Sequence, residues 1–428
     1  MKKNVLLLLL SVVAAAAFAD PSVTGIAVKQ RWPWSDKIDV DFTLNATTNC
    51  DIRFVFSHSG TATDRTITKN LSDATLCSVA PGEGHFTMDP ADFGIKGTSI
   101  ANLVVTAEEV ASVADRTFLV LDLSTGGYEY MAARPSDEWG WTNVVYKGEK
   151  MVFRRVPAGT YTVGHTAAEM KTARGSNPTQ AEKDSMLQRQ VVISSDYYIG
   201  IFPVTTAHMA YLSNGTATQK TTYTPYKNSF DLVRGMTNAD ESVSINWPIT
   251  GIGEFGVNTS LAKLQARVGG KLAIDLPTET QWEVAMRAGT TTIFHNGGTA
   301  ESTASELQAL WLEFAPSGTY EAVGLRAPNQ WDIYNPIGMY WYCCLDAFPR
   351  TTTAPWGEQN TWPGQSGRDP VGRTISPGDP LARVARGGGY ASGTGLGSMP
   401  GVRRGCDTNY DQYAFRLAIH LADPRIRQ

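Results

Sequence analysis

The sequence lacks two features that large classes of proteins require, which are clustered basic charge and closely spaced metal-ligating side chains. Its 37 Lys and Arg residues are outnumbered by 41 Asp and Glu, and nothing suggests the clustered Lys and Arg face that marks a nucleic-acid surface. The five cysteines include no C-x-x-C pair, which would indicate a zinc or redox site. The histidines lie too far apart in the sequence for a local iron triad; they are His58, His85, His165, His208, His295 and His420. We therefore expect no nucleic-acid partner and no local histidine metal site.

Long apolar runs are also missing, apart from one at the N-terminus. Met1, Lys2 and Lys3 precede an apolar stretch at 5–17, and Ala17-Phe18-Ala19 ends it with an A-x-A cleavage pattern. This order of basic, apolar and small residues is typical of a secretory signal peptide, and the stretch is shorter than the roughly 20 residues that span a bilayer. We predict a signal peptide at 1–19, a secreted or periplasmic protein, and no transmembrane segment in the mature chain.

The length of 428 residues favours two domains. Residues 20–125 contain short segments of alternating apolar and polar residues, such as 38–44 and 50–56, which are typical of half-buried strands. Further strands are expected at 66–71, 85–88, 100–107 and 117–123. About seven strands in roughly 100 residues predict an immunoglobulin-like β-sandwich.

The segment at 126–150 contains Gly, Pro and Trp, and we interpret it as a linker that packs on one domain. The residue pattern changes after it. Residues 151–421 combine few predicted helices, at 204–212, at 258–268 and after Pro277, with strands and long Gly- and Pro-rich stretches. Thr205 or Thr206 is expected to cap the first helix, and Thr278 with Gln281 forms a capping box on the third. This pattern predicts an α+β domain, followed by a tail at 422–428.

Six short sequence blocks follow one another between about 151 and 421. They are F-R-R-V-P-A-G-T at 153–160, Y-Y-I-G at 197–200, L-P-T-E-T-Q-W-E at 276–283, P-N through W at 328–341, R-G-G-G-Y at 386–390 and F-R-L at 415–417. In these blocks and in their order the region resembles the formylglycine-generating enzyme, or sulfatase-modifying factor, family, and the resemblance implies a C-type-lectin-like fold.

The resemblance places two copper-binding cysteines after the R-G-G block, and this chain has neither. The family positions hold Ser392 and Gly397. Copper(I) needs soft sulfur ligands, so copper and formylglycine-generating activity are not expected. The histidine cluster and the helical domain of the iron-dependent relatives are missing as well, whereas the periplasmic pigment-maturation branch shares fold and compartment.

The family's calcium loop corresponds to Asn335, Gly338, Tyr340 and Tyr342 in this sequence. The first three retain an amide and two carbonyls, but Tyr342 stands where the family has a glutamate. Calcium prefers anionic oxygen ligands, so the resemblance implies at most a weak calcium site at Asn335, Gly338 and Tyr340.

An oxidising compartment permits disulfides. Cys50 and Cys77 either bridge each other or remain two thiols. By resemblance to relatives that carry a cysteine after the W-E-W block, we expect a disulfide between Cys344 and Cys406, with Cys343 as the alternative partner.

Two functional hypotheses follow. The first is a non-catalytic binding or structural module for protein or glycan, with a candidate cleft at Tyr390, Ser392, Arg403, Arg404 and Cys406. Four aromatic residues near that cleft are candidates for recognising the ligand, and the alternative for each is packing in the core; they are Tyr390, Trp356, Trp362 and Tyr410. The second is an oxidoreductase of the formylglycine-generating or pigment-maturation type with altered chemistry, which requires several of the cleft residues to converge in one pocket.

Overall fold

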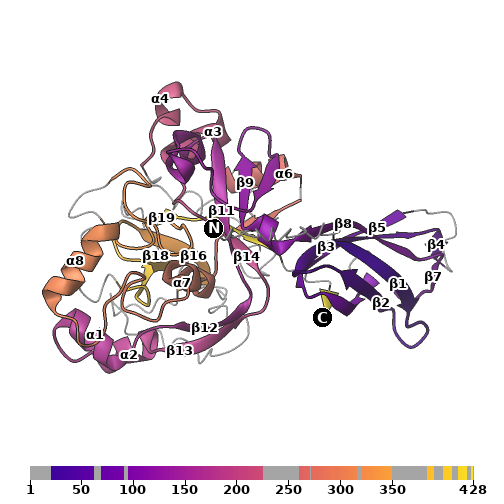
Figure 1. Ribbon diagram of the computed structural model, residues 1–428, viewed down its shortest axis with the longest axis horizontal. Coiled ribbons are helices and arrows are strands. Elements are labelled where there is room, and N and C mark those ends of the chain that lie inside the picture. The colour runs from indigo at the N-terminus through magenta and orange to yellow at the C-terminus, as the bar shows by residue number, and fades with distance from the viewer. Residues whose placement is uncertain are drawn as a thin grey trace, which may run out of the picture. The chain divides into compact units, whose positions relative to one another are not determined.

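The chain forms two compact units, which Figure 1 shows as ribbons. The computed structural model describes residues 21–61, 69–90, 95–224, 260–269, 271–315, 321–348, 383–389, 399–406, 413–421 and 426–427. One unit comprises Met1–Val113 with Arg425–Gln428, and the other comprises Ala114–Pro424.

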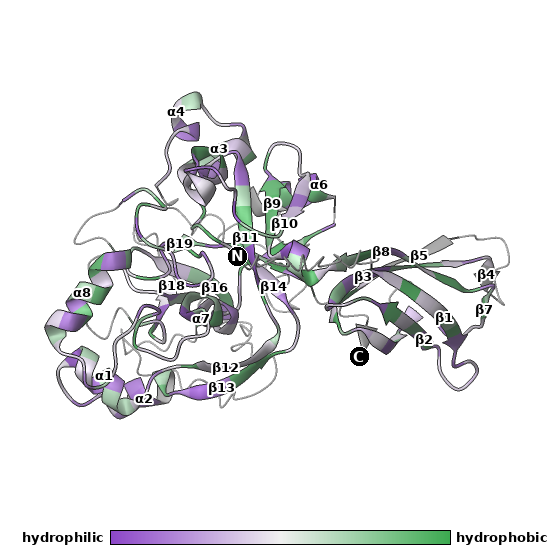
Figure 2. Ribbon diagram, in the orientation of Figure 1, coloured by the Kyte–Doolittle hydropathy of each residue, from purple (hydrophilic) through white to green (hydrophobic). Residues whose placement is uncertain are grey.

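The first unit is built from antiparallel strands around one apolar core. One sheet has the order β1-β2-β6-β21, a second has the order β5-β3-β8, and β4 pairs with β7. The alternation predicted for β2 is present, because Ile38, Val40 and Phe42 are buried while their neighbours are more exposed. In β3, Phe54 and Phe56 are buried and alternate with partly exposed residues. Figure 2 colours these strands by hydropathy. An immunoglobulin-like topology remains a prediction. The strands are β1 Ser22–Gln30, β2 Ile38–Asn45, β3 Cys50–His58, β4 Gly60–Thr61, β5 Lys69–Val79, β6 Gly82–Met88, β7 Ile100–Ala101, β8 Val104–Ser112 and β21 Ile426–Arg427.

The predicted domain boundaries at 125 and 150 are wrong. Strand β9 (Phe118–Asp122), expected in the first domain, pairs with β11 (Lys150–Val156) in the main sheet of the second unit. The expected linker at 126–150 also belongs there, because β10 (Tyr128–Met131) pairs with β9 and Trp141 is buried against Phe118. Strand periodicity alone does not tell which sheet a strand joins. Within the predicted tail at 422–428, the structure describes residues 426–427, which form β21 and pair with β6 of the first unit.

The second unit is an α+β domain, as predicted. Its largest sheet has the antiparallel order β10-β9-β11-β14-β20-β15, and a four-stranded sheet has the order β18-β17-β16-β19. A separate hairpin pairs β12 with β13. The remaining strands are β12 Gly159–Val163, β13 Arg189–Ile193, β14 Tyr197–Gly200, β15 Ala273–Asp275, β16 Trp341–Ala347, β17 Arg383–Arg386, β18 Arg403–Cys406, β19 Tyr413–Phe415 and β20 Ala418–His420.

The helices of the second unit are short and begin at well-formed caps. Thr205 caps α3 and Thr278 caps α7, each with the reciprocal contact of a capping box, which confirms both expected caps. None of the helices in the described part of the chain is long and apolar enough to cross a bilayer. The helices are α1 Ala167–Arg174, α2 Gln180–Met186, α3 Thr206–Ser213, α4 Ala217–Lys220, α6 Ser260–Val268, α7 Glu279–Arg287 and α8 Ala304–Phe314, with 3-10 turns η2 Val113–Arg116, η3 Gly140–Thr142 and η4 Val144–Lys147.

The cap of α3 contains a buried histidine that must stay neutral. His208 Nδ1 accepts from the Thr205 amide at 3.1 Å, and Nε2 contacts the carbonyl of Lys150 at 3.1 Å. Burial lowers the pKa of His208 to about 4. A proton on Nδ1 would also remove the acceptor for Thr205.

This arrangement predicts a specific pH dependence of stability. The unfolded histidine has a pKa near ~6.5, so the stabilisation is complete above pH ~6.5 and is lost as the pH falls toward about 4. His208→Gln keeps an acceptor and a donor but cannot titrate. Urea unfolding followed by tryptophan fluorescence should show that this variant loses about 2 kcal/mol less than wild type between pH 7 and pH 5. His85→Gln, on the surface of the first unit, is the control and should leave that loss unchanged. An identical loss in His208→Gln would contradict the assignment.

Candidate functional site

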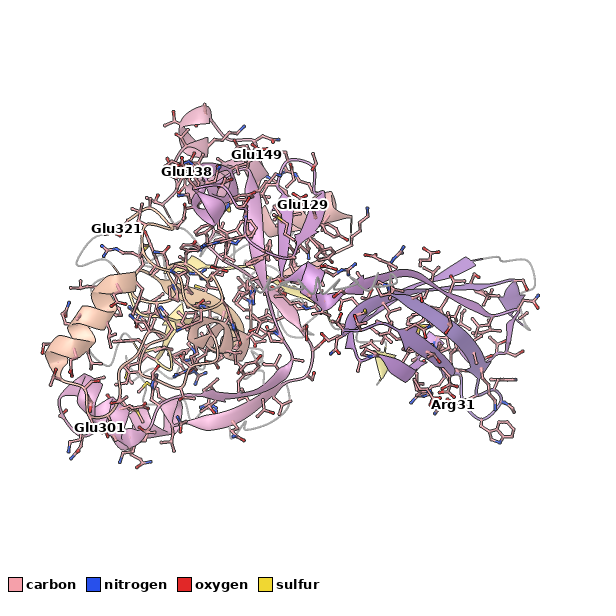
Figure 3. The ribbon with its side chains drawn as sticks, in the orientation of Figure 1. Arg31, Glu129, Glu138, Glu149, Glu301 and Glu321 are labelled. Carbon is pink, nitrogen blue, oxygen red and sulfur yellow. The ribbon has the colours of Figure 1, made fainter. Side chains whose placement is uncertain are left out.

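Helix α7 carries two glutamates and an arginine at intervals of four residues. Glu279, Glu283 and Arg287 are all buried, with at most 2% of each residue exposed. Residues four apart lie on the same side of a helix, where like charges repel. Two buried carboxylates one turn apart therefore require cations from elsewhere in the fold. Figure 1 shows α7 close to β16 and β18, and the glutamates labelled in Figure 3 lie instead at the outside of this unit.

Glu279 binds two arginines from the four-stranded sheet. Arg403 on β18 donates to both carboxylate oxygens, from Nε at 2.7 Å and from Nη2 at 2.8 Å. Arg386 on β17 donates from Nε at 3.1 Å. The backbone amide of Glu279 itself donates to Asp346 Oδ2 at 2.6 Å, which places a third carboxylate at the positive end of the helix. Glu279 thus joins α7 to three strands of the sheet.

Glu283, one turn further along, binds a second pair of cations. Arg287 Nε lies 2.8 Å from its Oε1, and Arg386 Nη1 lies 3.2 Å from its Oε2. The amide of Gly164 also donates to Oε1 at 2.8 Å. Burial alone would raise the pKa of Glu283, but the charges of Arg287 and Arg386 outweigh it and hold that pKa well below its usual value. Glu283 is therefore a permanent anion and not a proton donor or acceptor.

His165 extends the network as a neutral acceptor. Its Nε2 accepts from Arg287 Nη2 at 3.0 Å and from the Gly401 amide at 3.1 Å. Burial and the charge of Arg287 lower the pKa of His165 well below 6.5. Because Arg287 and the Gly401 amide both donate to Nε2, this nitrogen carries no proton. The imidazole thereby links Gly401 to Arg287 of α7.

We call the six charged residues of this network the buried clamp; they are Glu279, Glu283, Arg287, Asp346, Arg386 and Arg403. Three carboxylates face three guanidinium groups, and all six residues are nearly inaccessible. An arrangement of this kind fixes the positions of helices and strands and offers no open acid, base or nucleophile to a substrate. The role of the buried clamp is therefore to hold the fold together.

Of the predicted cleft residues, the structure describes the side chains of Arg403 and Arg404, and these two point to different surroundings. Arg403 belongs to the buried clamp, whereas the Arg404 guanidinium lies 5.7 Å from the centre of the Trp341 ring. Successive residues of a strand point to opposite faces, so these two side chains diverge. Tyr390 and Ser392 lie outside the described residues, as does the side chain of Cys406, and so do Trp356, Trp362 and Tyr410.

The cysteines differ from the expected pattern. Cys344 is a buried free thiol, and its neighbour Cys343 is the disulfide-bonded residue. Adjacent strand residues face opposite ways, so only one of this pair can point toward a given partner, and the expectation of a Cys344 disulfide is wrong. Burial, together with the nearby Asp346, raises the pKa of the Cys344 thiol well above its ordinary value.

Cys50 and Cys77 do not form a disulfide with each other. Cys50 and Leu76 both point into the core of the first unit. Because Cys77 follows Leu76 on β5, it points to the other face of the sheet and is only half-buried. The alternative of two thiols is the one that the structure adopts.

The residues expected to hold calcium do not fit a cation. The Asn335 side-chain oxygen Oδ1 accepts a hydrogen bond from the Gly324 amide at 3.0 Å. This contact already uses the side-chain oxygen that a calcium ion would need, and the other polar atom of the side chain, Nδ2, is a donor. The Asn335 carbonyl accepts from Tyr342 Oη at 2.9 Å and from Arg416 Nη2 at 2.6 Å. Calcium needs several oxygen ligands and favours a carboxylate, but this turn presents an amide donor, a phenol and a guanidinium.

Gly338 and Tyr340 have structural roles at the same turn. Gly338 has φ +86, and a Cβ there would lie 2.5 Å from the Trp311 ring, so only glycine fits. Its amide donates to the Gly387 carbonyl at 2.8 Å, which joins two of the sequence blocks. Tyr340 is fully buried in the core.

Other candidate sites in the described part of the chain are weak. No three of its His, Cys, Asp or Glu side chains gather into a group suited to a metal ion. One cavity of about 10 Å³ is lined mainly by apolar residues such as Met151, Phe153 and Phe202, and by His208. This volume is about that of one water-sized probe and far below the roughly 300 Å³ at which ligand pockets begin.

The blocks that meet at the buried clamp are those of a known family. The profile of the Sulfatase-modifying factor enzyme 1-like domain matches residues 142–421. The chain belongs to this family. Among solved structures it is similar to PvdO from Pseudomonas aeruginosa, at 15% identity and a TM-score of 0.41, over 63% of this chain and 94% of that one. It is also similar to CarF, at 14% identity and a TM-score of 0.28, over 61% of this chain and 98% of that one. No curated protein matches it in sequence.

The buried clamp is not among the features predicted from the sequence, although a signal for it is present. Glu279 and Glu283 both lie in the family block at 276–283. Their four-residue spacing beside the apolar Trp282, Val284 and Ala285 already indicates two carboxylates near a buried helix face, which must find arginine partners. Which arginines supply them depends on the sheet and is not written in the local sequence.

The buried clamp predicts that replacing a carboxylate of α7 lowers the free energy of unfolding far more than replacing a carboxylate at the surface. Glu279→Gln keeps the shape but removes the anion that Arg403 contacts through two nitrogens and leaves Arg386 with Glu283 alone, so it should cost about 3–5 kcal/mol of unfolding free energy. Glu301→Gln, at an exposed position of the same unit, should change stability by less than about 0.5 kcal/mol. Urea unfolding followed by tryptophan fluorescence measures both. Equal effects of the two substitutions would show that the clamp does not hold the domain together.

Proposed function

We propose that this family member is a secreted, non-catalytic module that binds protein or glycan or serves a structural role. The observation that carries the proposal is the replacement of both copper-binding cysteines by Ser392 and Gly397. Copper(I) chemistry needs two soft ligands held together, and an oxygen and a hydrogen atom do not supply them.

The adjacent sulfur atoms of Cys343 and Cys344 support this proposal. Cys343 is disulfide-bonded, and Cys344 is a fully buried thiol whose raised pKa disfavours the thiolate. Metal binding and nucleophilic attack both require the thiolate. Neither residue therefore replaces the missing pair.

The charged residues of the predicted cleft support it as well. Arg403 is committed to Glu279, and Arg404 stacks on Trp341. An oxidoreductase with altered chemistry would need such groups to converge on a substrate. Their divergence favours a module whose loops recognise a partner while the core stays fixed.

Secretion follows from the signal-peptide pattern at 1–19. A disulfide at Cys343 agrees with an oxidising compartment, because disulfides persist outside the cytosol.

A copper(I) competition assay tests the loss of catalysis. With ascorbate as reductant, the full-length mature protein should withdraw no copper(I) from a coloured chelator. Ser392→Cys/Gly397→Cys restores two thiols at the family positions and should withdraw about one equivalent, because paired thiolates bind copper(I) tightly. Stoichiometric copper withdrawal by the wild-type protein would restore the oxidase hypothesis.

A glycan array and a protein pull-down from the secreted fraction test the binding role. Trp356→Ala and Trp362→Ala should weaken binding at least about tenfold if these aromatics form the recognition surface, since a stacked aromatic contributes about 1–3 kcal/mol. Trp34→Ala is the matched control, because Trp34 is 90% exposed and lies in the first unit. If Trp34→Ala weakens binding and the other two substitutions do not, the recognition surface is not on the second unit.

A further inference from the structure

The turn at 31–37 connects β1 to β2 and exposes two tryptophans to solvent. Trp34 is 90% exposed and Trp32 is 39% exposed, and Pro33 between them is exposed as well. Figure 1 shows this turn as a loop that extends past the ends of both strands. Single apolar residues at a surface are ordinary, whereas neighbouring ones indicate a contact site. We call residues 32–34 the Trp tip.

Hydrogen bonds hold this turn in a defined conformation. The Arg31 amide donates to the Lys37 carbonyl at 2.8 Å, and the Trp34 amide donates to the Arg31 carbonyl at 3.1 Å. The Arg31 guanidinium donates to both carboxylate oxygens of Asp39 on β2, at 2.8 and 2.7 Å. Figure 3 labels Arg31 at the edge of the first unit. The Trp tip is therefore ordered before it binds anything, which lowers the entropic cost of binding.

A second segment supports the turn and brings a lysine next to it. Asp36 Oδ2 accepts from the Gly97 amide at 2.9 Å, and Gln30 Nε2 donates to the Thr98 carbonyl at 3.0 Å. Lys96 directly precedes Gly97 and is exposed. These contacts place Lys96 beside the turn although it is distant in the sequence.

The charge around the Trp tip is positive, although the whole chain has a formal charge of −4. Arg31, Lys37 and Lys96 outnumber the carboxylates of Asp36 and Asp39. Asp36 accepts from a backbone amide, and Asp39 pairs with Arg31. Lys37 and Lys96 are exposed, and neither makes an ion pair within the described part of the chain. Two lysines without a counter-ion therefore flank the tryptophans.

An anionic lipid surface fits this combination better than a sugar does. Tryptophan prefers the interface between lipid and water, and lysine is attracted to anionic headgroups. A sugar site would need hydrogen-bonding side chains beside the rings. The polar side chains of this turn are already used, because Ser35 accepts from the Lys37 amide at 3.2 Å and Asp36 from the Gly97 amide.

We propose that the Trp tip attaches the first unit peripherally to an anionic lipid surface. Trp32 and Trp34 enter the interfacial layer, while Lys37 and Lys96 lie close to the headgroups. The attachment uses residues outside the family match at 142–421, so it is independent of the function proposed for the second unit. Two rings and two charges give weak and reversible binding.

Cosedimentation of the full-length mature protein with lipid vesicles tests the proposal. The protein should bind vesicles of phosphatidylglycerol mixed with phosphatidylcholine, and should bind phosphatidylcholine alone at least about fivefold more weakly. Trp32→Ala/Trp34→Ala should weaken binding to the mixed vesicles at least about tenfold, because both rings lose their burial in lipid. Trp139→Ala removes a 60% exposed tryptophan of the second unit and should leave binding unchanged.

Trp34→Ala alone guards against a folding defect. Its side chain is almost fully exposed, so the Tm should equal that of wild type while binding to the mixed vesicles is already reduced. Binding by wild type that survives the loss of both tryptophans, or no wild-type binding to the mixed vesicles, would overturn the proposal. A dimer that forms without lipid and is lost in Trp34→Ala would instead assign the tip to a second copy of the chain.

The lysines are tested separately. Lys37→Gln/Lys96→Gln should weaken binding to the mixed vesicles about fivefold for each charge removed, and about 0.5 M NaCl should weaken wild-type binding in the same way. Lys171→Gln/Lys263→Gln removes two exposed lysines of the second unit and should have little effect. An equal loss of binding in the two double variants would show that net charge, and not the Trp tip, directs the protein to the vesicles.

Discussion

The architecture of the second unit depends on the pairing of buried charges along α7. A helix with two interior carboxylates one turn apart is unstable alone, and it becomes stable only when β17 and β18 bring Arg386 and Arg403 against it. Those strands in turn gain their position from the helix. The interaction is thus mutual, and it fixes the R-G-G block next to the L-P-T-E block although more than 100 residues separate them.

The described contacts of the buried clamp join α7 to three strands of the four-stranded sheet. Arg386 and Arg403 bring β17 and β18 to Glu279, and Asp346 of β16 accepts the first amide of the helix. A second buried cation works in the same way at another place in this unit. Arg416 joins the turn at Tyr334 and Asn335 to the carbonyl of Gly200 at the end of β14.

The sequence predicted the local elements well and their assignment to units poorly. Thr205 and Thr278 were identified as caps because a capping box is encoded within four residues. The periodicity at 118–122 indicates a strand. Its partner β11 follows only after β10 and the turns η3 and η4, and no local pattern reveals that pairing. The family blocks located the site region, whereas the partners of Glu279 come from strands that are distant in sequence. Long-range pairing is decided by the whole fold.

The two adjacent cysteines show how position within one strand determines chemistry. Cys343 is oxidised and Cys344 is a thiol, although both are fully buried on β16. A thiolate beside a disulfide would attack it and scramble the bond. Burial and Asp346 prevent this, because they raise the pKa of Cys344 and keep its sulfur protonated. Asp346 also accepts the first amide of α7 at 2.6 Å, so one carboxylate both anchors the helix that holds the domain together and keeps the neighbouring thiol unreactive.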